Sequence, residues 1–258
     1  MTQILIAALF AGTLFAGVLI CLRVGWRLGR RQLAELGENG HAGLGAVEGS
    51  IFGLVGLLIA FTFTGAAARF DQRRDLITQQ VNAIGTAWLR LDLVSEPARA
   101  ELRGMFRRYV DTILELSQKA AEPQVRTELL ARLNAQQTQI WAHATEAAKA
   151  DKSLPLVPSL LPPLNEMFDL ATSRILATRQ HPPVAIYVML GLLVLVSALM
   201  AGFGMAKAKR QSPLHLLGFA TIMALSVYLI LDLEFPRLGL IRIQSSDQAL
   251  SELRESMK

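Results

Sequence analysis

The sequence predicts an all-α integral membrane protein, with four transmembrane helices in two pairs around a helical extramembrane module. The first observation is a set of four apolar segments that contain no Asp, Glu, Lys or Arg. They cover residues 4–22, 49–68, 182–206 and 214–231. Each is close to the roughly 20 residues that a helix needs to cross a bilayer. The second observation is the charged stretch 69–181, which is too polar for the membrane interior.

Composition supports a membrane protein over a soluble domain. The 258 residues are 52% hydrophobic and carry a formal net charge of +5. The basic residues gather where apolar segments end, so lipid headgroups and the positive-inside rule explain this charge without nucleic acid. Cys21, the one cysteine, lies inside the first span, which excludes an internal disulfide and a thiolate metal site.

The first span has the features of a retained helix, not of a signal peptide. Met1-Thr2-Gln3 is uncharged, whereas a signal peptide begins with a basic region. The basic residues follow the span instead, at Arg23, Arg27, Arg30 and Arg31.

The second span is rich in small residues, which let membrane helices approach closely. No break signal follows it, and an apolar stripe at helical spacing continues beyond it. This stripe comprises Phe70, Ile77, Val81, Ile84, Trp88 and Leu91. The pattern therefore predicts one helix over residues 50–94 that continues out of the membrane.

Three further helices are predicted in the module. Pro97 begins the first, whose buried face is Leu102, Phe106, Tyr109, Ile113 and Leu116. Pro123 begins the second, which carries Val125, Leu129, Leu133, Ile140 and Trp141. A proline-rich break at 154–163 is expected to precede the last helix, 164–179, which carries Phe168 and Ile175.

Nothing in the sequence indicates an enzyme, a cofactor or a metal site. The four histidines lie in separate elements, and none has a metal-binding partner one helical turn away. Neither a phosphate-binding Gly-Lys-Ser loop nor a Gly-x-Ser-x-Gly elbow is present.

Two charged clusters flank the spans. Arg69, Arg73 and Arg74 follow span two, where they either anchor the helix to headgroups or form a positive ring that concentrates anions at a pore mouth. Asp232 and Glu234 end span four, where carboxylates oppose the helix dipole. The acidic pair is therefore either exposed to water or compensated by the basic cluster.

These clusters resemble those of bestrophins, which are pentameric anion channels, and more closely those of the bacterial bestrophin-like family. Three stretches and the two-plus-two layout carry the similarity. The stretches are Leu57-Leu58-Ile59-Ala60-Phe61 followed by Arg69-Phe70, Arg74 and Val81-Asn82; His181-Pro182-Pro183 with Tyr187; and Asp232-Leu233-Glu234-Phe235-Pro236 with Gly239.

The resemblance implies that helix two lines a pore in a homo-oligomer, a pentamer if the likeness extends to assembly. Carried over by position, its pore-lining candidates are Gly53, Leu57 and Phe61. Leu57 and Phe61 suit an apolar gate, whereas Gly53 supplies no side chain.

Calcium-activated bestrophins carry an Asp-rich clasp after the acidic-Pro-Gly element. Here residues 240–244 are followed by Asp247 alone, so we expect no calcium gating there.

Two indications disagree on orientation. The N-terminus before the first span is uncharged, whereas the short connectors carry basic residues, which favours an outward-facing module. These residues are Arg23, Arg27, Arg30, Arg31, Lys207, Lys209 and Arg210. The basic cluster after span two favours the opposite orientation, and the resemblance also implies a cytosolic module.

The expected organisation is transmembrane helices one and two in 1–68, the module in 69–181, helices three and four in 182–235, and a C-terminal tail in 236–258.

Two functions remain open for this multi-pass protein, which is expected in the bacterial plasma (inner) membrane. It is an oligomeric anion channel, or a non-conducting scaffold or sensor whose module binds a partner. A transporter is disfavoured because no span carries an ionisable acid or base at its middle.

Overall fold

A computed structural model describes residues 2–36, 44–119, 122–150, 156–208, 212–235 and 244–258. The elements are α1 (Thr2–Leu36), α2 (Leu44–Arg90), η2 (Leu91–Leu93), α3 (Ala98–Gln118), α4 (Pro123–Ala150), α5 (Leu156–Ala177), α6 (Val184–Gly204), η3 (Met205–Lys207), α7 (Pro213–Glu234) and α8 (Gln244–Ser256). No strand occurs in these ranges, which confirms the all-α prediction. The helices form two compact units, 1–69 with 181–241 and 70–180 with 242–258, called the first and second unit below.

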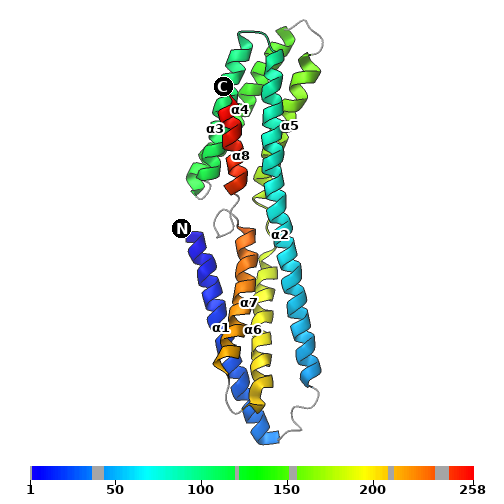
Figure 1. Cartoon of the computed structure of the whole chain (residues 1–258), viewed down its shortest axis with the longest axis vertical. Coiled ribbons are helices and arrows are strands. Elements are labelled where there is room, and N and C mark those ends of the chain that lie inside the picture. Colours follow the sequence, from blue (N-terminus) through cyan, green and yellow to red (C-terminus); the bar gives the residue numbers. More distant parts are fainter. Residues whose placement is uncertain (1, 37–43, 120–121, 151–155, 209–211, 236–243) are drawn as a thin grey trace. The chain divides into compact units, whose positions relative to one another are not determined.

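Four helices are long and apolar enough to cross a membrane, as the sequence predicts. The candidate spans are Leu9–Glu35, Gly45–Leu93, Val184–Lys207 and Pro213–Glu234. Within the first unit, α1 packs against both α6 and α7, and Figure 1 draws these three helices side by side.

Glycines allow α1 and α6 to touch through their backbones. A Cβ atom at Gly25 of α1 would collide with the carbonyl oxygen of Leu199, and one at Gly202 of α6 would collide with that of Leu22. A Cβ at Gly29 would meet backbone atoms of Phe203. Small residues at such crossings replace the hydrophobic driving force that is missing between helices in lipid.

Helix α2 is continuous from Leu44 to Arg90 and contributes residues to both units. This confirms the prediction of one long helix over residues 50–94, although the helix begins six residues earlier and ends at Arg90, where the 3-10 helix η2 follows. The apolar stripe beyond the second span is buried as expected: Ile77, Ile84 and Leu91 are at most 2% exposed. These side chains enter the core of the second unit.

That core is formed mainly by residues of α2, η2, α3, α4, α5 and α8. Tyr109 lies fully buried within it, with its ring edge-on to Phe168 at 6.3 Å between centroids. Its hydroxyl accepts a hydrogen bond of 3.1 Å from Nε2 of Gln137. Burial raises the pKa of Tyr109 to about 12, because the charged phenolate would lose its hydration.

One expectation for the second unit is wrong. Helix α5 begins at Leu156 and contains Pro162 and Pro163, where a break was predicted. Proline removes a helical hydrogen bond, but Leu156, Leu160 and Leu164 lie one turn apart and are all buried, so the apolar stripe outweighs that loss. Trp141, on the helix that begins at Pro123, is 39% exposed. The start of the predicted break, residues 154 and 155, lies outside the described residues.

The predicted tail contains a helix that docks on α3. Leu250 and Met257 are at most 2% exposed and belong to the core of the second unit. Arg254 forms a two-point ion pair with Asp111, with Nε–Oδ1 at 2.6 Å and Nη2–Oδ2 at 3.1 Å. Burial of two apolar side chains therefore anchors a polar helix that the sequence reading left unassigned.

Candidate functional site

The acidic end of α7 is buried, not exposed to water. Glu234 has no solvent-exposed area and Asp232 is 1% exposed. Both belong to the last turn of α7, where the helix dipole disfavours a carboxylate. A buried carboxylate also loses its hydration, so it requires a cation and hydrogen-bond donors nearby.

Arg69 supplies this compensation to Glu234. Its Nε donates to both carboxylate oxygens, at 3.2 Å and 2.9 Å, and its Nη2 donates to Oε2 at 2.8 Å. Planar guanidinium groups fit carboxylates in this two-pronged way and form stronger hydrogen bonds than neutral donors. The basic cluster after span two and the acidic cluster after span four are therefore joined by this pair.

His181 provides a second partner for Glu234. Its Nδ1 lies 2.9 Å from Oε1, and because an ionised carboxylate only accepts, this nitrogen carries the proton. The imidazole also packs against Phe235, with 4.9 Å between ring centroids. One buried carboxylate thus connects α2, α7 and the residues just before α6.

Asp232 is held differently from Glu234. The hydroxyl of Tyr228, one turn earlier on α7, lies 3.5 Å from its Oδ1. This distance is at the long limit for a hydrogen bond, so the contact is weaker than those made by Glu234.

The other two arginines of the basic cluster have other roles. Arg73 donates from Nε to the carbonyl of Ala177 at 3.2 Å and from Nη2 to that of Gln180 at 3.0 Å. It thereby satisfies one carbonyl group at the end of α5 and one three residues beyond it, where a basic side chain also suits the helix dipole. Arg74 is about half exposed, with a loose contact of 3.8 Å to Asp71.

The pore-lining candidates lie on an open face of α2. Leu57 is 51% exposed and Phe61 is 66% exposed. A Cβ atom added at Gly53 would have no neighbour within 4 Å. The three positions follow each other at intervals of four residues, so they share one side of the helix.

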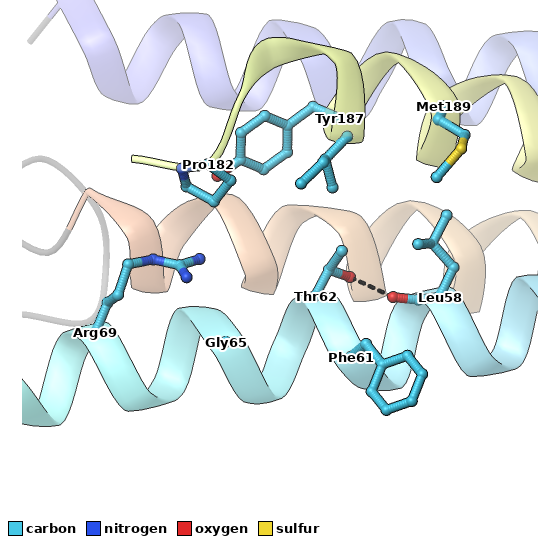
Figure 2. Close-up of a pocket in the computed structure, with 9 residues that line it drawn as sticks. Leu58, Phe61, Thr62, Gly65, Arg69, Pro182, Tyr187 and Met189 are labelled. Carbon is cyan, nitrogen blue, oxygen red and sulfur yellow. Dashed lines mark hydrogen bonds between the residues drawn. The ribbon is translucent and has the colours of Figure 1, made fainter. Parts of the chain in front are cut away.

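A half-open cavity of about 280 Å³ lies between α2 and α6 in the first unit. Figure 2 shows Thr62 and Leu58 pointing from α2 toward Tyr187 and Met189, while the ring of Phe61 points away from α6. Arg69 stands beside Pro182 at one end. Most of the lining is apolar, and the charged group is confined to that end.

Sequence reasoning found Arg69 and Glu234 but missed the contact with His181. The resemblance had singled out His181 only as part of a proline-rich entry to span three. A histidine just before one span and an acidic residue at the end of another give no local signal that they touch. The region after the acidic cluster, 236–243, which includes Gly239, lies outside the described residues, as does the side chain of Asp247.

No curated protein and no solved structure shows significant similarity to the chain. A family model described as the Bestrophin-like domain matches residues 11–248, which is most of the chain. The chain is therefore a member of the bestrophin-like family.

Proposed function

We propose that the protein is an oligomeric anion channel in which α2 of each copy lines a central pathway. In this proposal the spans form two pairs, the second unit lies outside the bilayer, and the assembly is a pentamer in the bacterial inner membrane. The supporting observation is the exposure of α2. Only 11% of the most apolar stretch of α2 is buried within the chain, whereas 22–28% of the corresponding stretches of the other three spans is buried.

The small residues on the exposed side of α2 indicate that this side packs against other copies of the protein and is not covered by lipid alone. Gly45, Gly49, Gly53 and Gly56 have no neighbour within 4 Å of an added Cβ. Small residues are typical of sites where membrane helices approach closely. Leu57 and Phe61 then form the narrow apolar part of the pathway, which can close by dewetting.

Charge supports a preference for anions. Arg74 is about half exposed near the end of the apolar segment of α2, and Asp71 contacts it only loosely. Repeated by symmetry around an axis, such a residue raises the local concentration of anions. Arg69 contributes less to this field because its charge is paired with buried Glu234.

We expect replacement of Phe61 by alanine to raise chloride conductance several-fold in planar bilayers, because a smaller apolar ring is easier to wet. Phe63→Ala is the matched control. Phe63 is also exposed, at 44%, but two residues along a helix it faces a different direction. Wild-type protein that conducts nothing across lipids, pH and voltage would refute the channel proposal.

A second candidate function, a non-conducting scaffold or sensor, is favoured by apolar residues exposed on the second unit. Leu89 is 69% exposed and Leu93 is 51% exposed. Adjacent exposed apolar side chains are typical of protein-binding surfaces. Under this function, Leu89→Asp should abolish retention of a defined soluble partner, while Leu176→Asp, at an exposed position on α5, should not. Chloride flux with no such partner would exclude it.

A further inference from the structure

The cavity between α2 and α6 has one charged end and one apolar end. Its charged end is formed by Arg69, at the last position of the first unit on α2, beside Pro182. Leu58 and Met189 line the other end. Leu58 lies eleven residues before Arg69 on the same helix, which corresponds to about three helical turns.

This order matches the direction in which a lipid lies in a bilayer. Arg69 follows directly after the uncharged segment 49–68, so it lies where α2 reaches the headgroup level. Leu58 and Met189 belong to the apolar candidate spans and lie at the depth of acyl chains. A ligand with a charged head and an apolar chain would therefore fit the cavity in the orientation it already has in the membrane.

The guanidinium of Arg69 keeps one nitrogen available to such a head. Glu234 occupies Nε and Nη2, which together form one edge of the group. Nη1 lies on the other side, next to Gly65, where an added Cβ would be 3.2 Å from it. Within the described part of the chain, Nη1 makes no hydrogen bond, so both of its N–H groups can donate.

The buried carboxylate also fixes this donor in place. Glu234 is fully buried and is itself held by His181, so the orientation of Arg69 does not depend on mobile surface contacts. The absence of a side chain at Gly65 leaves space beside Nη1. A preorganised donor beside an apolar cavity loses little conformational freedom when a ligand binds.

We propose that this cavity binds an anionic phospholipid of the surrounding bilayer, with its phosphate at Nη1 of Arg69 and one acyl chain between α2 and α6. A soluble anion would leave the apolar walls formed by Leu58, Ile186 and Met189 unfilled. A zwitterionic lipid would bring a cation toward an arginine. Phe61 also lines this cavity, although its ring points away from α6, so the lipid site adjoins the proposed pathway. Lipid binding is measured without ion flux, so this proposal and the channel proposal can fail separately.

The test is native mass spectrometry of the full-length protein in detergent, titrated with phosphatidylglycerol or with phosphatidylcholine of the same acyl chains. We expect phosphatidylglycerol to bind more tightly by up to about fivefold, since an unpaired basic residue near a membrane surface contributes about 1 kcal/mol and the pairing of Arg69 with Glu234 lowers this contribution. An excess of inorganic phosphate should not displace it. Equal affinity for the two lipids, or displacement by phosphate alone, would overturn the proposal.

Two variants separate this site from general lipid contact. Ile186→Trp fills the cavity and should remove the preference, and Met189→Trp serves the same purpose if the first variant does not fold. Val188→Trp is the control, since Val188 is 54% exposed on the same helix and does not line the cavity. Equal loss in the cavity and control variants would also overturn the proposal.

Discussion

Replacement of Arg69 by leucine is expected to lower the free energy of unfolding by about 3–5 kcal/mol, the range measured when one partner of a buried ion pair is removed. Glu234 has no exposed area, so it would remain buried with its negative charge after losing the two-point contact with the guanidinium. Unfolding of the full-length protein in mixed micelles, titrated with dodecyl sulfate and followed by tryptophan fluorescence, measures the change.

Two further variants make this prediction specific. Arg74→Leu removes an arginine from the same helix whose contact with Asp71 is exposed and 3.8 Å long, and should change stability by less than about 1 kcal/mol. The double variant Arg69→Leu/Glu234→Leu removes both charges and should recover much of the lost stability. Equal effects of Arg69→Leu and Arg74→Leu would show that the buried pair has no special role.

Substitution of Gly25 by valine is expected to disrupt the packing of α1 on α6. The added Cβ would collide with the carbonyl oxygen of Leu199, which belongs to a helix backbone and cannot move aside as a side chain can. Overpacking commonly costs about 1–3 kcal/mol, and we expect this change to reach or exceed the upper value. The yield of monodisperse protein and the midpoint of thermal aggregation both report it.

Gly12→Val is the matched control on the same helix. Gly12 has no neighbour within 4 Å of an added Cβ, so valine there should leave yield and thermal midpoint nearly unchanged. Gly202→Val should resemble Gly25→Val, because its Cβ would collide with the carbonyl oxygen of Leu22. A stable Gly25→Val protein would show that α1 and α6 can separate without loss of the fold.

The glycines show what composition alone leaves open. Small residues in the second span suggested that helix as the place of close approach, yet a Cβ added at Gly49, Gly53 or Gly56 would meet no described atom within 4 Å. The close contact lies instead between Gly25 and Gly202. A glycine permits a close approach, but which helix makes it depends on how the spans are arranged around each other.

The proline-rich segment and the tail show a similar limit. Pro162 and Pro163 are strong local signals for a helix end, and residues 244–256 are too polar to predict burial. Both segments are helical because Leu160, Leu164 and Leu250 reach the core of the second unit. Local propensity is a small term, and tertiary packing can exceed it.

The sequence by itself determined the four spans, the long second helix and the family resemblance, because each rests on composition or spacing within one segment. The apolar stripe Ile77, Ile84 and Leu91 could be read in the same way, since helical periodicity is local. The sequence also identified Arg69 and Glu234 as charges that require an explanation.

Only the tertiary structure decided how those charges are satisfied. Arg69 and Glu234 are 165 residues apart in the chain, and His181 lies between them in a third segment. No local pattern encodes a contact at that separation, because it exists only when α2, α6 and α7 pack together. The same packing leaves Leu57 and Phe61 exposed and forms the cavity beside Arg69. Proposed ion conduction and proposed lipid binding therefore both depend on how the helices pack against each other, which no single span determines.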